Sequence, residues 1–314
     1  MSRALPRTIR RIAARTLPLA LALAALPVSH AHAQRGAPGD YRSWIDTTYA
    51  FSRGGVIDAD QVAGDVIVTT WERPEVRVRA WAEHGQVRSR FSPDRVELRV
   101  EGERDGDRNR RIGDSGFEIT VPRGTRVKLA SVSGNVRVEG TGSEVEASAV
   151  SGDVTVRGVG GLASVHSVSG DVSVSRVDGD LTARSVSGDV QVSDVSGDVR
   201  AGTVSGEIEL EGLRSRVVTV KSTSGDIDFA GVLAPDGRYE LRSHSGNITV
   251  SVPSDAAANV SFSTFSGSFE SDFPVTIGGS ERRRSGRDME FTLGGGGARL
   301  TVQTFSGDVM LERR

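Results

Sequence analysis

The tripeptide Ser-Gly-Asp, with close variants, recurs at a nearly constant interval, and this repeat limits the possible folds more than any other feature. The interval is 18 residues, lengthens to 19 and then 21, and ends with a gap of 40 that is expected to hold two periods and an inserted loop. A period near 20 residues is typical of a solenoid, in which each coil contacts only its neighbours. The glycines of the repeat are Gly134, Gly152, Gly170, Gly188, Gly206, Gly225, Gly246, Gly267 and Gly307.

Within each coil the apolar residues follow the two-residue period of a β-strand. In the coil from Ser187 to Val204 each half reads approximately SGDV-x-V-x-x-V, and residues two apart lie on one face of a strand. The third apolar residue comes three positions later, where the chain is expected to turn a corner and point inward again. The inward residues expected in this coil are Val190, Val192, Val195, Val199, Ala201 and Val204.

Aligned coils place like residues in columns, as parallel strands stacked about 4.8 Å apart require. One column is Val136, Val154, Val172, Val190, Ile208, Ile227 and Ile248, and its neighbour is Val138, Val156, Val174, Val192, Leu210, Phe229 and Val250. We therefore predict an all-β chain that forms a single-stranded parallel β-solenoid (β-helix) with about 18–21 residues per coil.

The serine, glycine and aspartate of the repeat suit a tight turn. Glycine reaches positive φ angles, and the flanking polar side chains can bond turn amides. The aspartates also stack in a column, so a calcium ladder at Asp153, Asp171 and Asp189 is an alternative. Calcium-binding nonapeptides carry two further glycines per repeat, and Asn135 and Glu207 interrupt the column. Turn capping is the favoured interpretation, and no metal site is expected.

The chain divides into four segments by composition. Residues 1–33 read as a signal peptide, with five arginines, an apolar run from Leu17 to Leu26 and Ala31-His32-Ala33 before the expected cleavage site. A linker is expected over 34–46, and an N-terminal β cap with the first irregular coils over 47–130. The regular solenoid is expected over 131–314, with a loop insertion near 278–288. The mature chain has no other segment that predicts an integral membrane span.

Composition and motifs exclude several function classes. Without the five arginines of the signal peptide, the 39 basic residues become 34 against 41 acidic ones, a net charge of −7. Such a chain has no broad cationic surface for nucleic acid. It contains no cysteine and no HExxH, GxSxG or GxxxxGK motif. We therefore expect no catalytic residue and no cofactor.

The remaining polar residues favour a surface over a catalytic centre. The three histidines of the mature chain are far apart in sequence. His166 is expected to point outward, and His244 is expected to be partly buried in the column of Val168, Val186 and Phe265. The cluster Arg282-Arg283-Arg284 reads as a solvated loop. A flat polar column is expected on the outside at Thr155, Ser173, Gln191, Glu209, Asp228 and Thr249.

Three stretches resemble a known family. They are the repeated VSGDV, GDVIVTTWERPEVRVRA at residues 64–80 and TFSGDVML at 304–311. They are similar to the bacterial putative-adhesin family of exported β-strand-repeat domains of unknown function. The resemblance covers roughly residues 50–314. It implies a parallel β-solenoid located in the envelope or at the surface, with no catalytic residues to transfer.

The leading functional hypothesis is a non-enzymatic binding or scaffold module that uses an extended polar solenoid face. Its expected partners are envelope polysaccharide, matrix or a surface protein. One alternative is a carbohydrate-active enzyme, a lyase or glycosidase, with paired carboxylates in a cleft. Another is a periplasmic accessory protein of envelope stress. The protein is expected to be exported to the periplasm, the cell surface or the medium.

Overall fold

The computed structural model describes residues 41–105, 109–111, 113–274 and 288–314. All of them belong to one compact unit, residues 33–314. The expected signal peptide and its cleavage site lie outside the described residues. So do Arg282-Arg283-Arg284 and nearly all of the loop expected near 278–288.

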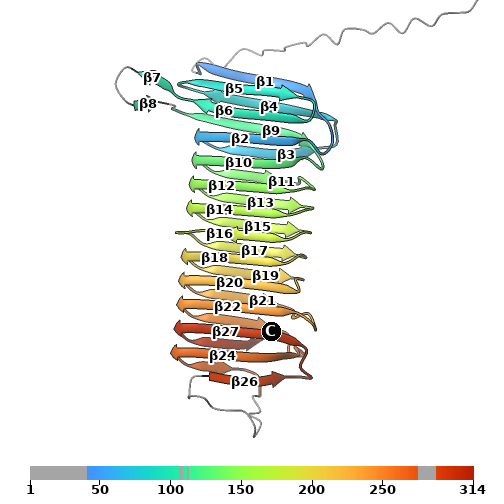
Figure 1. Ribbon diagram of the computed structural model, residues 1–314, viewed down its shortest axis with the longest axis vertical. Coiled ribbons are helices and arrows are strands. Elements are labelled where there is room, and N and C mark those ends of the chain that lie inside the picture. Colours follow the sequence, from blue (N-terminus) through green and yellow to red (C-terminus); the bar gives the residue numbers. More distant parts are fainter. Residues whose placement is uncertain (1–40, 106–108, 112, 275–287) are drawn as a thin grey trace, which may run out of the picture. The chain divides into compact units, whose positions relative to one another are not determined.

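Over the described residues the fold consists of two large, mostly parallel β-sheets, as predicted (Figure 1). In spatial order the strands of sheet A are β1 (Ser43–Ala50), β4 (Glu75–Ala82), β9 (Ser115–Pro122), β3 (Val66–Trp71), β11 (Val136–Glu139), β13 (Val154–Val159), β15 (Val172–Val177), β17 (Val190–Val195), β19 (Ile208–Leu213), β21 (Ile227–Gly231), β23 (Ile248–Val252), β28 (Val309–Arg313) and β25 (Phe269–Ser271). The strands of sheet B are β26 (Asp288–Leu293), β24 (Ala258–Ser266), β27 (Ala298–Ser306), β22 (Arg238–Ser245), β20 (Val217–Ser224), β18 (Val199–Ser205), β16 (Leu181–Arg184), β14 (Ala163–Ser169), β12 (Val145–Ser151), β10 (Arg126–Ser133), β2 (Val56–Ala63), β6 (Arg95–Glu101) and β5 (Gln86–Ser92). A short separate hairpin joins β7 (Glu103–Asp105) to β8 (Asn109–Arg111).

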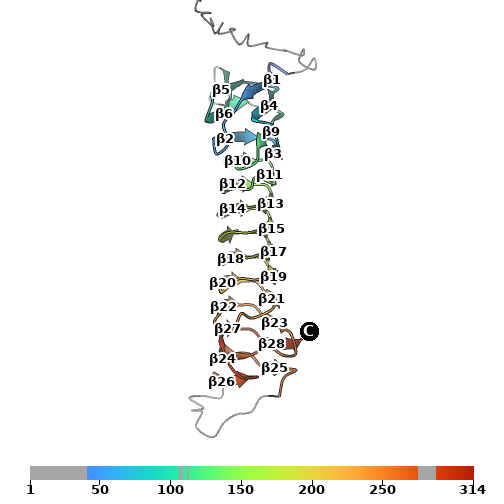
Figure 2. The ribbon, with the colours of Figure 1, turned by 90° about the vertical axis from the view of Figure 1, so that its right-hand side faces the viewer.

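Each regular coil contributes one strand to each sheet, and the two sheets face each other across a common core (Figure 2). Val136 pairs with Val154, Val154 with Val172 and Val172 with Val190, so like residues stack in register 18 positions apart. Both predicted valine-rich columns are buried, which confirms the inward face of these strands.

The prediction that Val204 points inward is wrong. Val204 is 45% exposed, and Thr203 lies inside instead. The Thr203 hydroxyl donates a hydrogen bond of 3.1 Å to the carbonyl of Gly188 in the preceding coil, which satisfies it in the interior. Strand alternation therefore continues to the end of β18, and the valine next to the turn faces solvent.

The first strands depart from the regular pattern. β4 runs antiparallel to both β1 and β9, and β5 runs antiparallel to β6. β1 begins at Ser43, so residues 43–46 form part of a strand instead of the expected linker. The antiparallel strands β1 and β5 lie at one edge of sheets A and B, and their role as a cap stays a prediction.

The coils at the other end do not stack in chain order. β27 lies between β22 and β24, and β28 lies between β23 and β25. The last coil is therefore inserted between two coils that precede it in sequence. This finding corrects the expectation that the gap from Gly267 to Gly307 holds two successive periods. After the residues left undescribed, the gap contains β26, which pairs antiparallel with β24.

Candidate binding surface along the margin of sheet B

The turns that join sheet B to sheet A are linked from coil to coil by side chains. The amides of Asp153, Asp171, Asp189 and Glu207 each donate a hydrogen bond of 2.8–3.0 Å to the side-chain oxygen at the same position of the preceding coil. Asn135 serves as an acceptor in this column as the aspartates do. This geometry gives Asp153, Asp171 and Asp189 a structural role in the turns.

The glycines of the repeat lie between consecutive strands, and six of the nine have a positive φ angle, as expected, but the other three require a different reason for glycine. At Gly188 the φ angle is outside the left-handed region, so backbone strain does not select glycine there. A Cβ atom on Gly188 would instead overlap the backbone carbonyl of Gly170 in the adjacent coil. Close packing of successive turns therefore requires glycine.

No histidine cluster forms among the described residues. His166 lies on the outer face of β14, as expected, and its Nε2 is 3.1 Å from the Ser164 hydroxyl. Burial is the main cause that lowers its pKa, and the charge of Arg184 adds to the effect. His84 lies between β4 and β5, and His244 lies on β22. Among all the residues that the structure describes, no group of three or more His, Asp or Glu side chains is placed to hold a metal ion.

A line of exposed valines follows the margin of sheet B, just before the turns. We call it the valine stripe. Each member lies at or just after the end of its strand, with Val186 two residues beyond β16, and parallel pairing places consecutive members side by side. Between 39% and 48% of each of these side chains is exposed, well above the core valines. The valine stripe consists of Val62, Val132, Val150, Val168, Val186 and Val204.

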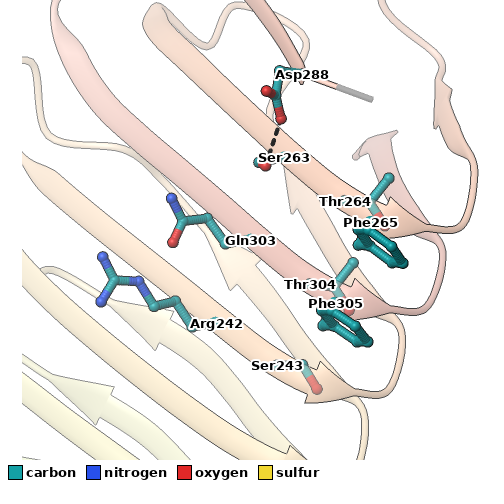
Figure 3. A pocket seen from close by; sticks show the side chains of 9 residues that line it. All are labelled: Arg242, Ser243, Ser263, Thr264, Phe265, Asp288, Gln303, Thr304 and Phe305. Carbon is teal, nitrogen blue, oxygen red and sulfur yellow. Dashed lines mark hydrogen bonds between the residues drawn. The ribbon is translucent and has the colours of Figure 1, made fainter. Parts of the chain in front are cut away.

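The same column continues into stacked aromatic rings, the aromatic ladder of His244, Phe305 and Phe265. Figure 3 shows the rings of Phe305 and Phe265. The rings of His244 and Phe305 have centroids 5.0 Å apart, and those of Phe305 and Phe265 are 4.8 Å apart and nearly parallel. Phe305 and Phe265 are about half exposed. His244 is exposed as well, so the prediction of a partly buried histidine is wrong. The inserted coil supplies Phe305 and so makes the ladder continuous.

A hollow of about 560 Å³ lies beside the aromatic ladder on the outer face of sheet B (Figure 3). Arg242, Gln303 and Ser263 come from three adjacent strands, and the Ser263 hydroxyl donates a 2.6 Å hydrogen bond to Asp288 on β26. The hollow thus combines donors, acceptors and aromatic surface. That combination suits a ligand with both hydroxyl groups and apolar carbon.

The predicted polar column lies on the outer face of sheet A, with Gln191 and Glu209 exposed. Gln191 donates a long 3.4 Å hydrogen bond to Glu209. Nearby, a hydrogen bond with Asp228 is the largest cause that raises the pKa of Glu207, followed by burial and by the charges of Asp228, Asp189 and Glu209. This part of the surface is acidic and carries no aromatic side chain among these residues.

The family of the chain follows from a match that spans most of the coils. The family model described as Toastrack DUF4097 matches residues 56–312, which include all nine turn glycines and most strands of both sheets, but not β1. The chain belongs to the Toastrack DUF4097 family. Among curated proteins, none matches this Toastrack chain.

Two solved structures are similar to the Toastrack chain. A putative adhesin from Bacteroides fragilis shares 13% identity with a TM-score of 0.42, over 87% of this chain and 98% of the other. A putative cell adhesion protein from Clostridium sporogenes shares 8% identity with a TM-score of 0.22, over 86% of this chain and 100% of the other.

Sequence reasoning missed the main surface feature of this Toastrack chain. The repeated valine before Ser-Gly-Asp was assigned to the interior because it is apolar. At Val132, Val168, Val186 and Val204, the signal that identifies the valine as outward is the serine or threonine directly before it, which takes the inward position. Ser167 and Ser185, like Thr203, donate hydrogen bonds to glycine carbonyls of the preceding coil.

Proposed function

We propose that this protein is a non-enzymatic binding module of the bacterial cell envelope. The observation that carries the proposal is the exposed aromatic ladder beside a polar hollow on the outer face of sheet B. The preceding coils of this column present exposed valines, whereas here half-exposed rings adjoin an arginine, an amide and a carboxylate. Exposed aromatic surface of this kind is enriched at recognition sites.

The favoured ligand is an envelope polysaccharide. The C–H groups of sugar rings pack against aromatic carbon, and sugar hydroxyls can bond with Arg242, Gln303 and Asp288. A parallel stack of coils also repeats its outer groups about every 4.8 Å, so a polymer can gain many weak contacts along several coils. The aromatic ladder would anchor such a ligand, and the neighbouring strands would extend the contact.

Export is part of the same proposal. The arginine-rich start, the apolar run and Ala31-His32-Ala33 predict secretion of a mature chain that begins at Gln34. Over the described residues there are no helices, and hence none long and apolar enough to span a bilayer. We place the mature protein in the periplasm, at the cell surface or in the medium.

The test is binding of the purified mature chain to envelope polysaccharides and whole cells, run beside a lyase and glycosidase panel. Replacing both Phe265 and Phe305 with alanine should weaken binding at least about tenfold, which corresponds to about 1.4 kcal/mol. The matched control Gln191→Ala, on the outer face of sheet A, should change binding by only a few tenths of a kcal/mol. Catalytic turnover in this panel would contradict the proposal if substitution of a single carboxylate abolished it while the protein stayed folded. The protein would then be an enzyme.

A further inference from the structure

The valine stripe is apolar and regular, and opposite charges flank its later coils, whereas the sheet B side of its first coils carries Asp58, Asp60 and Glu146, each ion-paired within the same chain. Three cations lie on its sheet B side: Arg184 and Lys221 are two residues before the column position of their coil, and Arg200 is four residues before it. None of the three forms an ion pair with another described residue. On the turn side lies the acidic column of Asp153, Asp171, Asp189, Glu207 and Asp226, each three residues after a position of the column, which Thr223 occupies in the coil of Asp226.

We propose that the valine stripe is the contact surface between two copies of this chain, related by a two-fold axis parallel to the stack of coils. Such an axis brings the two stripes together in parallel and in register. It also places the cationic side of one copy opposite the acidic side of the other, at the level of the same coil. Arg184 then faces Asp189, Arg200 faces Glu207 and Lys221 faces Asp226 of the second copy.

The charge pattern selects this arrangement over the other two-fold pairing. A two-fold axis in the interface but perpendicular to the stack would make the stripes antiparallel. Each flank would then face the same flank of the other copy, and like charges would oppose each other. An isologous contact also accounts for the regular spacing, because a second copy carries the same repeat of about 4.8 Å.

The size of the surface predicts a weak but specific dimer. From Val62 to Thr223 the column spans seven coils, or about 29 Å. The cationic side, the stripe and the acidic column form three parallel rows that are together about 20 Å wide. Each copy would therefore bury about 600 Å², which is near the lower limit for specific interfaces. We expect a dissociation constant in the micromolar range.

Repulsion within the acidic column supports a cationic partner. Neighbouring carboxylates stack at the spacing of the coils, and Glu207 is held near Asp189, Glu209 and Asp228. Cations from the second copy would reduce this repulsion, whereas an acidic or neutral partner would not. Because the aromatic ladder continues the same column, the axis would also bring the two ladders opposite each other at one end of the dimer, where pairing and polysaccharide binding would compete.

The absence of native cysteine allows a direct test with single-cysteine variants of the mature chain. A parallel two-fold axis places every stripe residue opposite its own copy. Val132→Cys, Val168→Cys and Val204→Cys should therefore each form disulfide-linked dimers under mild oxidation. The control Thr155→Cys, on the outer face of sheet A, should stay monomeric. Crosslinking at only one of the three stripe positions would indicate antiparallel stripes and overturn the proposal.

Sedimentation provides the second measurement, at protein concentrations up to about 200 µM. Val168→Glu should raise the dimer dissociation constant at least about tenfold while the melting temperature stays unchanged, because this side chain is exposed. Arg200→Glu and Glu207→Lys should each weaken the dimer, and the double variant should restore it. A wild-type chain that stays monomeric, or a dimer insensitive to Val168→Glu, would refute the pairing and leave the stripe to a different partner.

Discussion

The backbone amide of Asp171 lies 3.0 Å from Oδ1 of Asp153 and donates a hydrogen bond to it across the gap between two coils. Oδ1 of Asp171 accepts the same kind of bond from the amide of Asp189, at 2.9 Å. Each carboxylate therefore fixes the turn of the next coil. The column works as a chain of acceptors, which explains why asparagine also occurs in it.

This relationship predicts how Asp171 tolerates substitution. Asp171→Asn keeps an acceptor oxygen and should change the free energy of unfolding by less than about 0.5 kcal/mol, whereas Asp171→Ala removes it and should cost about 1–2 kcal/mol. Urea denaturation of both variants provides the comparison. Equal stability of the alanine and asparagine variants would show that the column does not stabilise the turns.

Calcium should have little effect on stability. One oxygen of each aspartate already accepts a backbone amide, and asparagine and glutamate interrupt the column. Folding that depends on a metal requires a dedicated set of ligands in each site. The measurement is the melting temperature with millimolar calcium and then with chelator. A rise of many degrees that the chelator reverses would establish a calcium ladder.

Gly188→Val should be among the most damaging single changes, and Gly188→Ala should also be severe. Any Cβ atom at this position overlaps the backbone of Gly170, and overpacking against an adjacent coil costs about 1–3 kcal/mol or more. Gly295→Ala is the control, because a Cβ atom there meets nothing within 4 Å. If Gly188→Ala melts like the wild type, the turns are packed less closely than the structure shows.

Two neighbouring valines should respond in opposite ways to the same substitution. Val190 is fully buried, so Val190→Asp places a charge in the core and should cost about 4 kcal/mol or prevent folding. Val186 is 44% exposed, and Val186→Asp should cost less than about 0.5 kcal/mol. Thermal melts at low protein concentration, where the chain is monomeric, separate the two. Similar losses for both variants would show that the assigned register is wrong.

Glu207 should make stability depend on pH. Its pKa is raised in the folded state, so between the unfolded and folded pKa values the folded chain binds more protons. Protons then favour folding, and this contribution is lost as the pH rises through the folded pKa. Glu207→Gln should therefore melt above the wild type at pH 7, and the difference should shrink as the pH falls through the folded pKa. A difference that is constant with pH would exclude repulsion as its cause.

The parallel sheets were predictable because every coil repeats the same alternation of apolar residues and the same turn tripeptide. Val136 and its column equivalents show both the strand period and the stacking interval, and every coil tests the register again. The outward valines were not predictable from hydrophobicity alone. In several coils the residue before the valine is a serine or threonine, such as Ser167 or Thr203, which enters the interior because a glycine carbonyl in the preceding coil accepts its hydrogen bond.

The order of the last coils was beyond local reasoning. Both β24 and β27 carry the same inward pattern, so either strand fits against β22 by sequence alone. Stacking order is decided by contacts between whole coils and by the connection through β26. A short sequence motif does not reveal this order. The aromatic ladder was missed because the gap of 40 residues was expected to hold a further coil between Phe265 and Phe305, whereas β24 and β27 pair directly.

The insertion separates the order in which the chain is synthesised from the order in which it is assembled. Residues 258–271 leave the ribosome before residues 298–313, yet they can reach their final neighbours only afterwards. A polypeptide that stops before Ala298 would lack the strands that pair with β22 and β23 on one side and with β24 and β25 on the other. The residues of β27 and β28, which are synthesised last, therefore join the coils on either side of them. Premature termination would remove both coil interfaces at once.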